Sequence, residues 1–148
     1  MMNAKSRFEA TRAAVPRLNE VKALIMYGCD DWRPDGVRTS VATSDPTAAA
    51  AIRAVDELAD KLDALRAEES ELEDLIGTSL AIIAAVRRGF GEIYANLLEW
   101  RYIDGWTWKR IHDDKGIKRH VGYYLVNIAF DWIDSVGVSR LLRGENEL

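Results

Sequence analysis

Four side chains near the C-terminus have types and spacing suited to reading hydrogen-bonding groups on another molecule. They are Arg119, His120, Tyr123 and Asn127. Residues three and four positions apart share one face of a helix, so His120, Tyr123 and Asn127 form a single stripe beside Arg119. In the DNA major groove, arginine pairs with guanine and asparagine with adenine through two hydrogen bonds each. We therefore expect these four residues to contact DNA bases.

Positive charge that could bind a phosphate backbone gathers around the same stripe. Between residues 107 and 130, five positively charged residues stand against two acids, although the whole chain has a net charge of −4. The acidity is concentrated between residues 56 and 74, where nine acids stand against two positive residues. Lysine and arginine hold phosphates without regard to base sequence. The residues expected to bind phosphates are Lys109, Arg110, Lys115 and Lys118.

Three short helices separated by tight turns must position these residues. The first is expected over 92–102 and stops near Gly105, and the second runs over 107–115 from a capping threonine. Gly116 then precedes a third helix that begins near Lys118. This order of three short helices, with tight turns between them, has the spacing of a helix-turn-helix unit, in which the last helix is the recognition helix.

Apolar spacing predicts which faces of these helices are buried. They are Ile93, Leu97, Leu98 and Tyr102 in the first helix, Trp108 and Ile111 in the second, and Val121, Leu125, Ile128 and Trp132 in the third. On this phase Val126 falls on the outward face, beside the polar stripe. A short last helix is expected after Gly137, and residues 145–148 are expected to fray.

The first 90 residues are predicted to form a helical arm. Apolar residues recur at helical steps over 5–28, with Pro16 marking a kink or a first turn, and residues 29–44 are expected to form a loop. An acid followed by proline then starts a long helix over 46–88, whose apolar residues follow a nearly seven-residue repeat. Such a helix must pack against the N-terminal helix, against a second copy of itself, or both. The whole chain is therefore predicted to be all-α, with an arm over 1–90 and a helix-turn-helix unit over 91–148.

Other kinds of chemistry find little support in the sequence. The two histidines cannot complete a metal ligand set, and the single cysteine, Cys29, stands beside acids rather than the positive neighbours that activate a thiolate. No apolar run approaches the roughly 20 residues of a membrane helix, and no secretory signal is recognisable. We expect no enzymatic activity, no metal, no cofactor, no membrane contact and a cytoplasmic location.

The C-terminal pattern resembles a known family. The run over 97–111, with the following Lys-Gly-Ile and Arg-His-Val and with Ala129, is similar to region 4 of sigma-70-type factors. It is closer still to small phage and prophage transcription regulators of the ArpU and RinA type, in which a long helix often precedes this unit. The positions that match their core are Tyr102, Ile103, Gly105, Thr107, Trp108 and Ile111. The specific part of the resemblance covers residues 97–131.

This resemblance implies a phage- or prophage-type transcription regulator that binds double-stranded DNA and contacts RNA polymerase. We also expect the arm to form a homodimer through coiled-coil packing. Two alternatives stay open, namely a packaging protein similar to small terminase subunits and a protein-interaction adaptor that keeps the fold without binding DNA. The acidic charge balance favours the adaptor somewhat.

Overall fold

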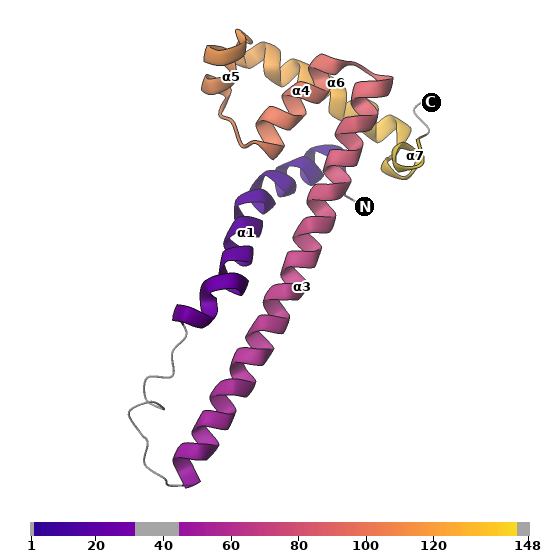
Figure 1. Cartoon of the computed structure of the whole chain (residues 1–148). Coiled ribbons are helices and arrows are strands. Elements are labelled where there is room, and N and C mark those ends of the chain that lie inside the picture. Colours follow the sequence, from indigo (N-terminus) through magenta and orange to yellow (C-terminus); the bar gives the residue numbers. More distant parts are fainter. Residues whose placement is uncertain (1, 32–44, 145–148) are drawn as a thin grey trace. The chain divides into compact units, whose positions relative to one another are not determined.

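The computed structural model describes residues 2–31 and 45–144, and every regular element in these ranges is a helix (Figure 1). The elements are α1 (Ala4–Asp31), α3 (Asp45–Gly89), α4 (Glu92–Leu98), the π-helix η1 (Glu99–Ile103), α5 (Trp108–Lys115), α6 (Arg119–Val136) and α7 (Val138–Leu142). No strand occurs within the described ranges, so the predicted all-α class is confirmed. None of the described helices has the length and hydropathy needed to cross a membrane.

The helix predictions agree with these bounds except near two ends. α1 continues three residues past Gly28, and it passes through Pro16 without interruption. Because proline has no N–H, the carbonyl of Arg12 lacks its helical partner there. The single helix predicted over 92–102 is observed as α4 followed directly by η1, and the short last helix predicted after Gly137 is present as α7. Residues 32–44 and 145–148, predicted as loop and frayed end, lie outside the described residues.

The chain packs as two compact units. Unit 1 comprises residues 1–16 and 72–148, and unit 2 comprises residues 17–71. α1 and α3 each contribute one part to unit 1 and another to unit 2. The predicted boundary at residue 90, between an arm over 1–90 and a helix-turn-helix unit over 91–148, therefore stays a prediction.

An aromatic cluster joins the N-terminal helix to the core of unit 1. Phe8 is fully buried, and its ring lies 5.7 Å from the rings of both Tyr102 and Phe130, measured between centroids. Tyr102 and Phe130 are themselves 5.7 Å apart. Other fully buried side chains of this unit are Ile82, Val86, Leu97, Leu98, Ile111, Val126, Ile133 and Leu141. The start of α1 is therefore part of the same core as α4, α5 and α6.

Two polar contacts fix the start of α1 within unit 1. The backbone N–H of Ala4 donates to Oδ1 of Asp134 at 2.8 Å. The hydroxyls of Thr11 and Ser79 lie 2.6 Å apart, and both side chains are completely buried. A buried hydroxyl without a partner is costly, so this pair makes a polar residue acceptable in the apolar stripe of α3.

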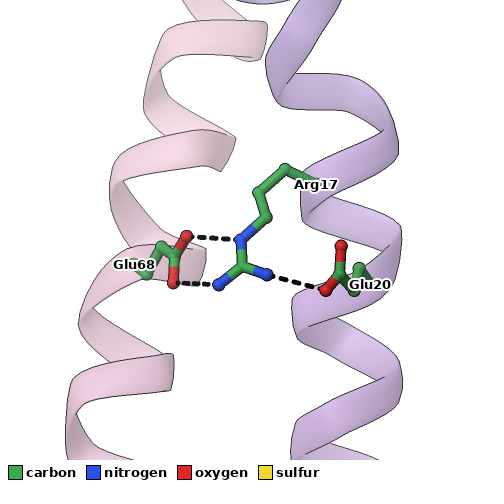
Figure 2. A network of polar contacts seen from close by, with 3 residues as sticks. All are labelled: Arg17, Glu20 and Glu68. Atoms are coloured by element: carbon green, nitrogen blue, oxygen red, sulfur yellow. Dashed lines mark hydrogen bonds and ion pairs between the residues drawn. The ribbon is translucent and has the colours of Figure 1, made fainter.

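A polar network joins the two helices of unit 2. The guanidinium of Arg17 on α1 donates to both carboxylate oxygens of Glu68 on α3, at 2.7 and 3.0 Å, and to Glu20 at 2.9 Å (Figure 2). Hydrogen bonding from Arg17 holds the pKa of Glu68 below its ordinary value, and the same contact raises the pKa of Arg17. The long helix thus packs against the N-terminal helix, one of the two arrangements predicted.

Candidate nucleic-acid interface

The second helix of the predicted motif begins and ends as its sequence indicates. Thr107 caps α5, and its hydroxyl accepts a hydrogen bond from the backbone N–H of Arg110 at 3.1 Å. At the other end Gly116 has a left-handed backbone with φ of 72°, and its N–H donates to the carbonyl of His112 at 2.8 Å. Glycine adopts this conformation without the steric cost that a side chain adds. The turn between α5 and α6 is therefore short and defined.

Close packing of one glycine against a tryptophan sets how α6 lies on α5. A Cβ atom placed on Gly122 would lie 2.4 Å from Cζ3 of Trp108, which is too close for any side chain. The Trp108 ring also lies 4.7 Å from the ring of Tyr123. An isolated glycine inside a helical pattern often has such a packing reason, and this was the available signal in the sequence.

The predicted buried face of α6 is wrong by about one residue. Val126 is only 2% exposed although it was predicted to face outward, whereas Val121 is 38% exposed although it was predicted to face the core. The residues of α6 that are buried are Gly122, Val126, Ala129, Phe130, Ile133 and Val136. Small residues let α6 approach its neighbours most closely, so a pattern read from large apolar residues alone misplaces the face. In α4, Ile93 is likewise exposed, and Ala95 is buried.

The four residues expected to contact bases are nevertheless all exposed. Arg119, His120, Tyr123 and Asn127 lie in the first nine residues of α6. The Arg119 guanidinium lies 5.5 Å from the centroid of the Tyr123 ring, and hydrogen bonding from Arg119 lowers the pKa of the Tyr123 phenol. The structure thus brings Arg119 and Tyr123 together, one turn apart on the helix. The shift of the buried face leaves these four side chains accessible because the solvent-facing side of α6 is broad.

The four residues expected to bind phosphates are also exposed, but two of them are engaged with aromatic rings. The guanidinium of Arg110 lies 4.1 Å from the ring centroid of Trp106 and 3.4 Å from the Asp114 carboxylate. Lys115 Nζ lies 5.1 Å from the ring of Trp100. Lys109 and Lys118 make no such contact with an aromatic ring of the described residues. Arg110 and Lys115 therefore lie beside the two tryptophans.

Those two tryptophans form a stacked pair, with Trp100 near the start of η1 and Trp106 after its end. The rings of Trp100 and Trp106 are 5.9 Å apart and nearly parallel, with an interplanar angle of 9°. The N–H of Trp106 donates to the carbonyl of Trp100 at 2.8 Å. Gly105, with φ of 73°, reverses the chain between them. Trp106 is half-buried.

Two arginines near α6 were absent from the sequence-based site. Arg101 lies half-buried over the ring of Trp108, 5.1 Å from its centroid, and donates to the carbonyl of Trp106 at 3.1 Å. Burial lowers the pKa of Arg101, and the positive charges of Arg12 and Arg119 lower it further. Arg101 lies inside the run that resembles sigma region 4, so its sequence position was informative. For Arg12 on α1 the sequence contains no signal, because only folding brings it to this place.

Other ionisable groups near the site have structural explanations. Burial raises the pKa of the Tyr102 phenol to about 12, so this core tyrosine keeps its proton at neutral pH. His112 Nδ1 lies 3.5 Å from a carboxylate oxygen of the adjacent Asp113, and His120 is exposed on α6. Among the residues that the structure describes, no three histidine, cysteine or carboxylate side chains lie close enough to hold a metal ion.

Comparisons with protein-family models, with curated proteins and with solved structures give no match for this chain.

Proposed function

We propose that this chain binds double-stranded DNA as a cytoplasmic transcription regulator of phage or prophage type. In this proposal α5 and α6 act as a helix-turn-helix pair, and the beginning of α6 enters the major groove. Arg119, His120, Tyr123 and Asn127 read base edges, while Lys109, Arg110, Lys115 and Lys118 bind the phosphates beside them.

The charge of the exposed surface at the start of α6 is the observation that carries the proposal. From Lys118 to Phe130 the chain contains two positive residues and no acid, and the first acid of α6 is Asp131. The start of a helix also presents unpaired backbone N–H groups and a partial positive charge. An exposed helix start with this composition suits a groove lined by phosphates.

The rigid attachment of α6 supports the same proposal. Base recognition requires that side chains be held in a fixed register against the duplex. The contact between Gly122 and Trp108 and the capped turn from Gly116 hold α6 against α5. Recognition residues on a helix fixed in this way keep the geometry that a hydrogen-bond pattern demands.

Self-association through unit 2 completes the proposal. Ile52 and Val55 of α3 are 63% and 62% exposed, so apolar side chains of the long helix remain accessible to a second copy. Dimers of helix-turn-helix proteins bind two half-sites about one helical turn of DNA apart. A homodimer would therefore recognise a DNA target made of two related halves. In this proposal the bound dimer also contacts RNA polymerase.

A salt titration with the mass measured in solution tests this function. Fluorescence anisotropy with random and host-genomic duplexes should show affinity that falls steeply as salt rises, because binding releases counterions from the phosphates. Replacing both Arg119 and Asn127 by alanine should remove the preference for genomic targets, at about 1–3 kcal/mol for each lost base contact. Arg88→Ala, an exposed arginine in the last turn of α3, is the matched control and should change neither.

The same measurements separate the alternatives. A regulator should be a monomer or dimer, whereas a packaging subunit similar to small terminases should form a ring of many copies. Absence of any salt-dependent binding to duplex DNA would contradict the proposal and favour an adaptor that binds protein.

A further inference from the structure

Three arginines from distant parts of the sequence lie together beside the start of α6. Arg12 comes from α1, Arg101 from η1 and Arg119 from the first position of α6. Phe8 places α1 here, because its ring contacts Tyr102, the residue that follows Arg101. Arg12 stands one helical turn after Phe8 and so lies on the same side of α1. All three arginines belong to unit 1.

The cluster concentrates positive charge without neutralising it. Arg12 and Arg119 both lie close enough to Arg101 to lower its pKa. In the part of the chain that the structure describes, none of the three forms an ion pair with a carboxylate. An acid on α1, Glu9, is exposed, and its charge acts on the phenol of Tyr102, the residue after Arg101. Like charges placed together in this way cost free energy unless an anion binds between them.

Packing prepares the cluster for an anion with several oxygens. The Arg101 guanidinium is held over the Trp108 ring and by the Trp106 carbonyl, and Arg119 lies over Tyr123. Side chains held in place lose less conformational freedom on binding. The planar guanidinium matches the oxygens of a phosphate through two parallel hydrogen bonds.

We propose that Arg12 joins Arg101 and Arg119 in a binding site for backbone phosphates of the duplex, so that α1 is part of the DNA interface. This inference rests on the proposed function and extends it beyond α5 and α6. When a recognition helix enters the major groove, phosphates of the adjacent backbone flank its start. The N-terminal helix then positions the protein on the duplex without reading its sequence.

Arg12→Ala tests this inference cleanly. No hydrogen bond or ion pair involves the Arg12 side chain in the described ranges, so its loss should leave helix content unchanged. The thermal midpoint should not fall, because the substitution also removes repulsion from Arg101. The slope of log affinity against log salt concentration should become shallower by about 0.9, the value for one phosphate contact on duplex DNA. Affinity at low salt should fall roughly tenfold, and by the same factor for random and genomic duplexes.

Two further variants sharpen the result. Arg12→Lys keeps the charge and should keep the wild-type slope. Arg88→Ala removes one positive charge two residues before Phe90. In unit 1 the Phe90 ring stacks on Trp132, in the later half of α6, with the two ring centroids 5.0 Å apart. Trp132 lies thirteen helical steps after Arg119, about 20 Å along α6. This control should therefore also keep the wild-type slope.

The outcomes distinguish this inference from the function beneath it. If the wild type binds with a steep salt dependence and Arg12→Ala has the same slope as Arg88→Ala, the α1 contact is wrong and the function stands. If the wild type itself binds no duplex, the proposed function is wrong and the phosphate site is wrong with it.

Discussion

Units 1 and 2 use parts of the same two long helices, yet water reaches their side chains to very different extents. In unit 1 the aromatic cluster around Phe8 and the leucines of α4 are completely buried. Among the side chains described in unit 2, only Val21 is buried, and the helices are joined by the surface network of Arg17. An apolar core stabilises unit 1, whereas helix propensity and polar contacts contribute a larger share of the stability of unit 2.

This difference concerns function as well as stability. The residues proposed to bind DNA lie on the unit whose side chains are fixed by close packing, as precise recognition requires. The more exposed unit keeps apolar side chains accessible on α3, which suits association with another chain. Matched substitutions in the two units should therefore change stability by different amounts.

Matched leucine substitutions should show the largest contrast. Leu98→Ala removes a fully buried side chain from unit 1 and should lower the free energy of unfolding by about 2–5 kcal/mol. Leu62→Ala removes a half-buried side chain from unit 2 and should cost only about 1 kcal/mol. Denaturant unfolding monitored by circular dichroism measures both. Equal losses would show that the two units are packed alike.

A pair of glycines within unit 1 should give effects of opposite sign. Gly122→Ala forces a Cβ atom against Trp108 and should destabilise the fold by about 1–3 kcal/mol. Gly77→Ala meets no atom within 4 Å on an exposed part of α3, and it should stabilise by up to about 1 kcal/mol because alanine favours helix. Thermal unfolding of the two variants checks this. A neutral Gly122→Ala would mean that α6 does not lie closely on α5.

The ion pair of unit 2 should produce the smallest effect, visible through its pH dependence. The pKa of Glu68 is lowered in the folded chain, so the pair stabilises above the unfolded-state pKa, near 4.5. That contribution is lost as pH falls through the lower, folded-state pKa. The difference in thermal midpoint between wild type and Arg17→Ala should therefore be present at pH 7 and vanish in acid. High salt should also reduce it, and a difference that persists in acid would exclude this explanation.

Local signals in the sequence were sufficient for the helices and turns near the candidate site. The capping threonine at 107 and the glycine at 116 stand where the backbone needs them, because caps depend on neighbouring residues. The bounds of α5 and the start of α6 agree with the prediction to within one residue. These features require no knowledge of distant contacts.

Features that depend on distant residues were not predictable in the same way. The buried face of α6 was misplaced because Gly122 and Ala129 pack closely, whereas apolar patterns weight large residues. Ser79 interrupts the apolar stripe of α3, and only its partner Thr11 explains it. The position of Arg12 beside Arg101 likewise depends on the docking of Phe8. Each is a tertiary contact between residues far apart in the chain.

Mapping of the bound surface by NMR tests the central claim most directly. Amide chemical shifts of the 148-residue chain would be followed while a target duplex is added. We expect the largest changes over 118–127, with smaller ones near Arg12 and Arg101. Changes confined to α3 between residues 48 and 71, or none over 118–127 at saturating DNA, would contradict the proposal that α6 enters the groove.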